Sequence, residues 1–310
     1  MKLVITEPKD FSLKALDLLK SKFEVIQLAD INNLNNIIEN VDVLFIRLGI
    51  ILNDKILKKA KVLKFICSPT TGLDHIDIEY CKNKNIKVIS LKNEIDFLGS
   101  IPSTAEHTWT LLTAINRKLH LAQIDVNSKH WDRNKFKTYN LRGKTLGILG
   151  IGRVGKQVAK FALAIGMKVI SYDTDKRQTF ENIECVNHPE DLFLKSDFVS
   201  IHIPLNKNNE KFVNNNLISL MKKEACIINT SRGKVWDENA IVNALLSDKI
   251  RGVATDVVQD EISHNIFASP IFKIDTSKYN CIITPHIAGA TYDSMAMTEV
   301  FIANKLLKNV

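Results

Sequence analysis

Three residues of types that support acid–base chemistry follow apolar runs in the second half of the chain: Arg232, Glu261 and His286. A guanidinium keeps its charge at any working pH and can bind a carboxylate and a carbonyl through its fork of N–H groups. An imidazole can give and take a proton near neutral pH, and a carboxylate beside it orients the ring and favours its charged form. If these side chains meet, they suit the interconversion of a 2-keto acid and a 2-hydroxy acid, with the hydride supplied by a cofactor.

Each of these residues also has an ordinary interpretation. Arg232 could be a surface arginine beside a helix, and Glu261 lies in a polar loop where carboxylates are common. His286 could serve in packing or capping, because it stands between a proline and an apolar residue. His202, at the end of another apolar run, suits a structural role beside a cofactor better than a catalytic one. Three suitable residue types at three expected strand ends nevertheless favour catalysis.

Residues 145–173 indicate the source of the hydride. An apolar run, Thr145–Leu149, predicts a buried strand, and it is followed by G-I-G-R-V-G, a helical pattern and a second apolar run. This is a G-x-G-x-x-G motif in the strand–helix–strand order that a dinucleotide site requires. Gly150 permits the tight turn, Gly152 lets the backbone approach a pyrophosphate, and Gly155 lets the helix pack close to the strand. Free N–H groups at the start of the helix then face the phosphates.

Asp173 follows the second run, where a carboxylate can accept hydrogen bonds from an adenosine ribose. A carboxylate there repels a 2′-phosphate, which favours NAD over NADP. Lys176 and Arg177 lie just beyond and could offset that repulsion. NAD is the preferred cofactor of the two.

Strand-like and helical stretches alternate on both sides of this motif. Strand-like runs precede it at residues 3–6, 24–28, 43–47, 63–67 and 87–91, and follow it at 198–203, 225–230, 252–257 and 281–284. Such alternation predicts parallel sheets covered by helices, here an α/β chain of two doubly wound parallel-sheet domains. We expect a Rossmann coenzyme domain of residues 99–286 inserted in a flavodoxin-like substrate domain, residues 1–98 completed by 287–310.

Helical spacing is also predicted over 102–126 and, at the end of the chain, over 298–308. The polar segment 127–144 carries Trp131, Phe136 and Tyr139. Large aromatic side chains in such a segment suggest that it packs against another protein surface. The segment is either an arm that packs on another subunit or a lid on the chain's own surface.

The composition is that of a globular protein, with 45% hydrophobic and 25% charged residues in a chain of 310. No apolar stretch approaches the ~20 residues that span a bilayer, and an acid and a proline come too early for a signal peptide. The five cysteines are scattered without a C-x-x-C pair, which predicts free thiols, no metal centre and a cytoplasmic location. The net charge of +8 is spread along the chain. We therefore expect a small anionic substrate, and neither a nucleic-acid nor a membrane partner.

Together these motifs resemble the D-isomer-specific 2-hydroxyacid dehydrogenases, the group that includes D-3-phosphoglycerate dehydrogenase. The matching segments are TTGLDHID (70–77), STAEHT (103–108), LGILGIGRVGKQVA (146–159), HIPL (202–205), NTSRG (229–233), ATDVVQDE (254–261) and TPHIAGAT (284–291). The resemblance implies an NAD-dependent oxidoreductase that transfers a hydride between nicotinamide and a small 2-keto acid or D-2-hydroxy acid. Glyoxylate/hydroxypyruvate and 3-phosphoglycerate/phosphohydroxypyruvate are the candidate substrates. It also implies a homodimer formed through the coenzyme domain.

The resemblance further implies roles for individual residues. Arg232 would bind the substrate carboxylate and carbonyl, and His286 would be the acid/base, paired with Glu261. Backbone amides around Thr70, Thr71 and Gly72 would help to hold the substrate carboxylate. The cofactor site would be lined by Thr71, Gly150, Gly152, Arg153, Val154, Gly155, Asp173, His202, Ile203, Pro204, Thr230, Ser231, Asp256 and Ala288, with Asp256 near the nicotinamide amide.

The sequence departs from the family pattern at Ile262, where proline is usual, at Trp236, where a small aliphatic residue is usual, and in the loop 92–99. These differences do not affect the predicted catalytic residues, but they leave the identity of the substrate open. Formate dehydrogenases of this superfamily carry glutamine where Glu261 stands, which disfavours that activity. Two alternatives stay open: an NAD(H)-sensing binding protein of the corepressor type, which shares the fold, and a different NAD-dependent oxidation such as that of phosphite.

Overall fold

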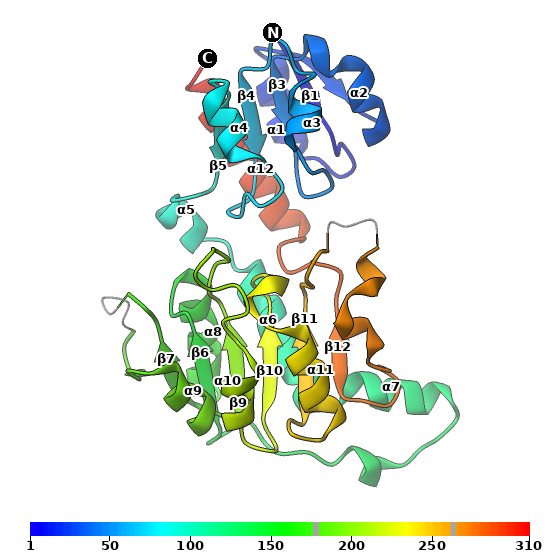
Figure 1. Ribbon diagram of the computed structural model, residues 1–310, viewed down its shortest axis with the longest axis vertical. Coiled ribbons are helices and arrows are strands. Elements are labelled where there is room, and N and C mark those ends of the chain that lie inside the picture. Colours follow the sequence, from blue (N-terminus) through cyan, green and yellow to red (C-terminus); the bar gives the residue numbers. More distant parts are fainter. Residues whose placement is uncertain (176–179, 262–264) are drawn as a thin grey trace. The chain divides into compact units, whose positions relative to one another are not determined.

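The computed structural model describes residues 1–175, 180–261 and 265–310 (Figure 1). These residues divide into two compact units. Unit 1 comprises Met1–Ile101 and Ala290–Val310, and unit 2 comprises Pro102–Gly289. Unit 2 is therefore inserted between two segments of unit 1. Lys176 and Arg177, which bear on the choice of cofactor, and Ile262 lie outside the described residues.

Unit 1 is built on a parallel sheet in which the described strands have the order β2-β1-β3-β4-β5. The strands are β1 (Lys2–Ile5), β2 (Glu24–Gln27), β3 (Val43–Phe45), β4 (Phe65–Ser68) and β5 (Lys87–Ser90). Successive side chains of a strand point to opposite faces. Leu3 and Phe45 accordingly join the core on one face, and Val4 and Leu44 join the core on the other. The strand order 2-1-3-4-5 is the flavodoxin-like order expected from the sequence.

Helices cover both faces of this sheet. They are α1 (Leu13–Lys20), α2 (Leu34–Ile37), α3 (Asp54–Leu57), α4 (Ile78–Asn83), α5 (Ile95–Gly99) and α12 (Tyr292–Leu307). Side chains of α1, α5 and α12 pack into one core, and side chains of α2, α3 and α4 pack into the other. The prediction that the last helix starts at residue 298 is wrong, because α12 begins six residues earlier, where Thr291 caps it by accepting a hydrogen bond from Ser294 N.

Unit 2 is built on a second parallel sheet, in which the described strands have the order β12-β11-β10-β9-β6-β7-β8. The strands are β6 (Thr145–Leu149), β7 (Lys168–Tyr172), β8 (Glu184–Cys185), β9 (Phe198–Ile201), β10 (Cys226–Asn229), β11 (Gly252–Thr255) and β12 (Cys281–Ile283). Counted from β6, this is the dinucleotide-binding order 3-2-1-4-5-6 with one further strand at the β12 edge. The prediction of two doubly wound parallel α/β sheets, one inserted in the other, is confirmed.

The helices of unit 2 also lie on two faces. They are α6 (Ser103–Asn116), α7 (Leu119–Asn127), α8 (Arg153–Ala164), α9 (Pro189–Lys195), α10 (Asn215–Leu220) and α11 (Glu238–Leu246). Side chains of α6 and α8 pack on one face of the sheet, and side chains of α9, α10 and α11 pack on the other. The predicted single helix over 102–126 is wrong. Lys118 has a left-handed backbone (φ +51°) that no right-handed helix can include, so the stretch forms α6 and α7 separately.

Six 3₁₀ turns complete the described secondary structure: Ile31–Asn33, Ile38–Asn40, Arg133–Phe136, Gly233–Val235, Ile266–Ala268 and Pro270–Lys273. Trp236, a residue type unusual for the family at this position, is fully buried in the core to which α9, α10 and α11 contribute side chains. The five cysteines are free, and four of them are buried. Throughout the described part of the chain, each helix is too short or too polar to cross a membrane.

Candidate active site

The glycine loop joins β6 to α8 at the point where the strand order reverses, which is where ligands bind in doubly wound sheets. Gly150 has φ +95°, and a Cβ on it would lie 2.9 Å from the carbonyl carbon of His202. A Cβ on Gly155 would overlap the carbonyl oxygen of Gly150. Gly152 differs, because a Cβ there would meet no atom within 4 Å. The fold itself thus requires two of the glycines, whereas Gly152 faces open space.

The start of α8 fits an anionic group in that space. Gly152 is the N-cap residue, and no side chain caps the helix there. The first N–H groups of a helix have no partner within the helix and, together with its dipole, attract phosphate. Arg153 and Val154 form the first turn. A pyrophosphate at this helix start stays a prediction from the sequence.

Asp173 lies at the end of β7 and contacts the glycine loop. One carboxylate oxygen accepts a hydrogen bond from Ile151 N (3.0 Å), and the other accepts one from Asp175 N (3.0 Å). A carboxylate has about four acceptor positions, and the described part of the chain occupies two of them. Asp173 therefore helps to fix the glycine loop, and its contact with a ribose stays a prediction.

The segment after β9 lies against the glycine loop. Ile203 approaches Gly150, since a Cβ on that glycine would lie 2.9 Å from Ile203 Cγ2. Pro204 is exposed. The His202 ring nitrogen Nε2 is 2.8 Å from Ser200 Oγ. Burial, and then the neighbouring charge of Arg153, lower the pKa of His202 to about 3. His202 is therefore neutral at physiological pH, which agrees with a structural role rather than an acid–base one.

The segment after β10 presents Arg232. Asn229 organises this turn: its side-chain oxygen accepts hydrogen bonds from both N and Oγ of Ser231, and its Nδ2 donates to the carbonyl of Arg232. The hydroxyl of Thr230 lies 2.7 Å from that of Thr108 on α6. The Arg232 guanidinium donates to the carbonyl of Ser231 (2.8 Å). A network of short-range hydrogen bonds thus fixes the backbone from which the arginine extends.

Glu261 and His286 are in direct contact. The Nδ1 atom of the imidazole is 2.9 Å from Glu261 Oε1, and the two side chains are 27% and 21% exposed. Partial exposure leaves the ring accessible to a substrate. His286 has φ +54°, a conformation uncommon for residues other than glycine. Its backbone N–H donates to the carbonyl of Asp256 (2.9 Å), which holds this turn.

Asp256, at the end of β11, organises the loop that follows β12. Its carboxylate accepts hydrogen bonds from the hydroxyl of Thr284 (2.5 Å) and from the N–H groups of Ile287 (2.9 Å) and Ala288 (2.7 Å). Burial alone would raise the pKa of Asp256. Hydrogen bonds, beginning with one from His107, outweigh burial and lower this pKa. The residue predicted to lie near the nicotinamide amide is therefore a buried anion that also fixes the loop carrying His286.

His107 on α6 is a member of this network that the sequence interpretation did not select. Its Nε2 lies 3.0 Å from Thr284 Oγ1 and 3.3 Å from Asp256 Oδ1. The only sequence signal was its place in the STAEHT segment. Its partners Asp256 and Thr284 lie 149 and 177 positions away along the chain.

The strands β10, β11 and β12 are neighbours in the sheet, so the residues that follow them share one edge (Figure 1). Adjacent strands are about 4.8 Å apart, which places the turn of Arg232 roughly two strand spacings from that of His286. The structure joins Glu261 to His286 directly and brings Arg232 to the same edge. Thr70, Thr71 and Gly72 belong to unit 1, where the hydroxyl of Thr70 donates to the carbonyl of Gly72 (2.8 Å) and the side chain of Thr71 is exposed.

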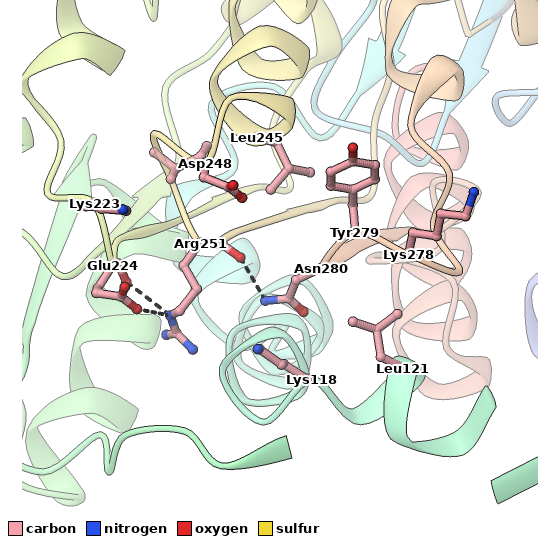
Figure 2. A pocket seen from close by; sticks show the side chains of 11 residues that line it. Lys118, Leu121, Lys223, Glu224, Leu245, Asp248, Arg251, Lys278, Tyr279 and Asn280 are labelled. Carbon is pink, nitrogen blue, oxygen red and sulfur yellow. Dashed lines mark hydrogen bonds and ion pairs between the residues drawn. The ribbon is translucent and has the colours of Figure 1, made fainter. Parts of the chain in front are cut away.

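A pocket in unit 2 lies at the amino ends of the strands, opposite to the carboxyl ends that bear the predicted site residues (Figure 2). Its lining includes Glu224, Arg251 and Asn280, which precede β10, β11 and β12, and none of the sequence-predicted site residues. Arg251 donates to the carbonyl of Glu224 (3.1 Å) and forms an ion pair with its carboxylate. This pocket is therefore separate from the glycine loop and from the Glu261–His286 pair.

Residues 109–288 match the family model described as "D-isomer specific 2-hydroxyacid dehydrogenase, NAD binding domain". The chain belongs to this family. It is 33% identical to the hydroxypyruvate reductase of Thermotoga maritima over 99% of this chain and 97% of that enzyme. It is 34% identical to the D-3-phosphoglycerate dehydrogenase of Methanocaldococcus jannaschii over 87% of this chain but only half of that enzyme.

Solved structures agree with this family. The D-lactate dehydrogenase of Aquifex aeolicus, in complex with NAD and lactic acid, superposes with a TM-score of 0.83 at 29% identity, over 100% of this chain and 96% of that one. The chain is an NAD-dependent oxidoreductase of the D-2-hydroxyacid dehydrogenase family, and NAD is its cofactor. These relatives are dehydrogenases and reductases by name, and they lend no support to the corepressor alternative.

Proposed function

We propose that this dehydrogenase interconverts a small 2-keto acid, such as glyoxylate or hydroxypyruvate, and its D-2-hydroxy acid. The observation that carries the proposal is the 2.9 Å contact between Glu261 and His286 at the sheet edge that also bears the glycine loop. Similarity to a hydroxypyruvate reductase along nearly its full length supports this substrate class. In this proposal unit 2 is the coenzyme domain and unit 1 is the substrate domain.

Bound NADH supplies the hydride, and the chain's own residues bind, orient and exchange the proton. Arg232 binds the carboxylate and the carbonyl oxygen through its fork of donors. His286, protonated at Nε2, gives its proton to the carbonyl oxygen during reduction and takes it back during oxidation. Glu261 accepts from Nδ1 and so orients the ring and stabilises its cationic form.

The residues we assign to NAD follow the strand ends of unit 2. Gly152, Arg153 and Val154 hold the pyrophosphate, since the helix start is uncapped and the space beside Gly152 is open. Asp173 accepts from the ribose. The remaining assignments are Gly150, Gly155, His202, Ile203, Pro204, Thr230, Ser231, Asp256 and Ala288.

Two substitutions test the catalytic assignment. In His286→Ala and Arg232→Ala, reduction of a panel of 2-keto acids with NADH is expected to fall roughly 10²–10⁴-fold, because positioned acid/base groups contribute that much. Binding of NADH, measured by its fluorescence, is expected to change less than about twofold, because neither residue is assigned to it. Loss of absorbance at 340 nm follows the reaction, and NADPH in parallel measures the cofactor preference.

His188→Ala is the matched control. This imidazole is exposed and makes no capping hydrogen bond at the start of α9, so its loss is expected to leave turnover unchanged. Turnover at the parent rate in both His286→Ala and Arg232→Ala would refute the assignment of these residues.

We further propose a cytoplasmic homodimer that associates through α7 and the segment 128–144. Four buried free cysteines support the location. Leu119 and Val126 on α7 are 61% and 43% exposed, and Trp131 is 91% exposed. A tryptophan so exposed does not cover the chain's own surface, which favours an arm for a second copy over a lid.

A further inference from the structure

Glu238 is a buried carboxylate to which the chemistry above gives no role. It is the first residue of α11 and is 1% exposed. It is not needed as a cap, because Asp237 already accepts a hydrogen bond from Asn239 N (3.0 Å) at this helix start. The helix dipole favours a glutamate in the first turn even when its side chain is exposed to solvent. Burying the carboxylate costs free energy, so other interactions must compensate for the burial of Glu238.

Both oxygens of Glu238 bind the segment that follows β11. Oε1 accepts a hydrogen bond from Gln259 N (2.6 Å). Oε2 accepts from the hydroxyl of Ser269 and from Ile271 N (3.4 Å). Burial raises the pKa of Glu238, and these three hydrogen bonds counteract that effect. One side chain of α11 thus holds a loop at both of its ends.

A second close contact fixes the same loop. A Cβ on Gly233 would overlap the backbone of Val258 and Gln259, so the turn after Arg232 packs directly on it. Gln259 is therefore held from two sides, two residues before Glu261. The nearby ion pair between Lys234 and Asp260 is largely exposed (45% and 56%) and contributes little to that position.

We propose that Glu238 is a positioning residue of this active site: it sets the place of the Glu261 carboxylate and, through it, the orientation of the His286 ring. This inference rests on the proposed function. Glu238 itself touches no reacting atom. Its hydrogen bond to Gln259 N fixes the backbone from which Glu261 reaches the imidazole.

A double-mutant cycle tests the proposal. Glu238→Leu is expected to lower kcat/KM for the keto acid about 10-fold or more, because a misplacement of about 1 Å in the reacting groups can cost about 10²-fold. The effect is expected in kcat, with NADH affinity within about twofold of the parent. In the Glu261→Gln background the same change is expected to cost less than about twofold. Equal losses in both backgrounds would overturn the proposal.

The pH dependence separates positioning from general destabilisation. A carboxylate beside an imidazole favours the protonated ring, so Glu238→Leu and Glu261→Gln are both expected to move the midpoint of the pH–rate profile for reduction to lower pH. The conservative Glu238→Gln keeps an acceptor for Gln259 N and is expected to restore most of kcat and the parental midpoint. A midpoint that stays in place in Glu238→Leu overturns the proposal, even when activity falls.

Asp197→Asn is the matched control, because Asp197 also accepts a backbone hydrogen bond in unit 2 (Thr145 N, 2.8 Å) but lies at the opposite edge of the sheet. It is expected to lower stability without moving the midpoint. The titration of the His286 ring by NMR, assigned by its loss in His286→Gln, gives a readout that needs no activity. If the parent and Glu261→Gln reduce keto acids equally, the proposed catalytic role fails, whereas this titration still decides whether Glu238 acts on the Glu261–His286 pair.

Discussion

At the scale of single residues, two glycines of the glycine loop are expected to have different roles: Gly155 in packing and Gly152 in cofactor binding. Gly155→Ala places a methyl group against the carbonyl of Gly150, so we expect the free energy of unfolding to fall by about 1–3 kcal/mol. Gly152→Ala meets no atom within 4 Å and is expected to change stability by less than about 0.5 kcal/mol. It is nevertheless expected to weaken NADH binding about tenfold or more, because the methyl group fills the space assigned to the pyrophosphate. Urea unfolding and fluorescence titration measure the two effects. Unchanged NADH affinity in Gly152→Ala would refute our placement of the pyrophosphate.

The residues that could be predicted from the sequence are those whose chemistry shows in their type and local setting. Arg232, Glu261 and His286 stand just beyond strand ends, and the ends of parallel strands meet at one edge. His107 and Glu238 could not be found in this way. Each acts through contacts with residues 20 or more positions away, and neither lies in a pattern that indicates such partners.

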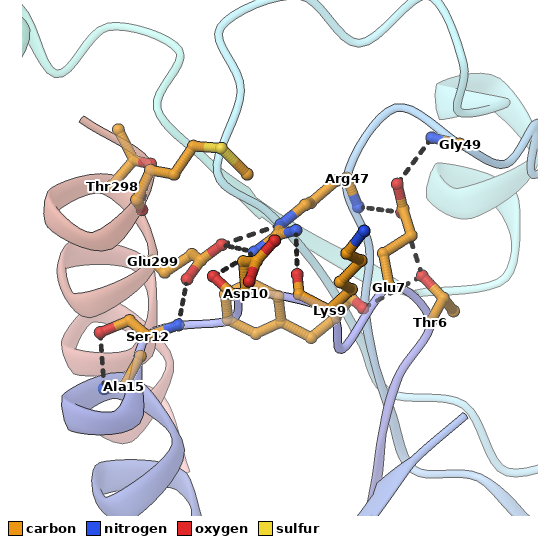
Figure 3. Close-up of polar contacts among 12 residues, drawn as sticks. Thr6, Glu7, Lys9, Asp10, Ser12, Ala15, Arg47, Gly49, Thr298 and Glu299 are labelled. Carbon is orange, nitrogen blue, oxygen red and sulfur yellow. Dashed lines mark hydrogen bonds and ion pairs between the residues drawn. The ribbon is translucent and has the colours of Figure 1, made fainter. Parts of the chain in front are cut away.

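At the scale of elements, α12 is fixed to unit 1 by a buried ion pair (Figure 3). The carboxylate of Glu299, 1% exposed, accepts hydrogen bonds from Ser12 N (2.7 Å) and from Nε (2.8 Å) and a terminal nitrogen of Arg47. Burial raises the pKa of Glu299, and these donors oppose that effect. Glu299→Ala leaves a largely buried guanidinium without its anion, so we expect unfolding to become easier by about 3 kcal/mol. Lys305→Ala on the same helix, whose ion pair with Glu94 is about one-third exposed, is expected to cost less than about 1 kcal/mol. Equal costs for the two variants, measured by chemical denaturation, would contradict this account.

Helices and strands could be predicted where apolar residues recur with the matching period. Boundaries that depend only on backbone conformation could not be predicted. The described strands other than β8 (Glu184–Cys185) could be predicted, because they are short apolar runs between turns. β8 could not, because it is only two exposed residues long. The break between α6 and α7 could not be predicted, because a lysine at position 118 carries no signal for a left-handed backbone. The sequence gives no sign of the start of α12, because its first turns expose Tyr292 and Met297 and so lack an apolar stripe.

At the scale of the whole molecule, the inserted order of the two units was predictable, because the dinucleotide motif lies in the middle of the chain with strand–helix alternation on both sides. A subunit interface could not be predicted to the same extent, since no sequence pattern marks the surface that a second copy would contact. The structure adds the exposed fraction of each side chain, which indicates candidate interface residues. Asp125 on α7 is buried and pairs with Lys135 (2.6 Å), so the segment that carries Trp131 is tied to α7 while the indole itself is exposed.

This exposure yields a prediction about assembly. Symmetric dimers bury large aromatic side chains at the centre of their interfaces, where one such residue commonly contributes 2 kcal/mol or more. We therefore expect the parent protein to sediment at twice its chain mass of 35.0 kDa, and Trp131→Ser to raise the dimer dissociation constant about 30-fold or more. Phe267→Ser is the matched control, because Phe267 is also a highly exposed aromatic of unit 2 (76%) but lies outside α7 and the segment 128–144. If Phe267→Ser weakens the dimer as strongly as Trp131→Ser, exposure alone does not identify the interface; a monomeric parent would refute the dimer itself.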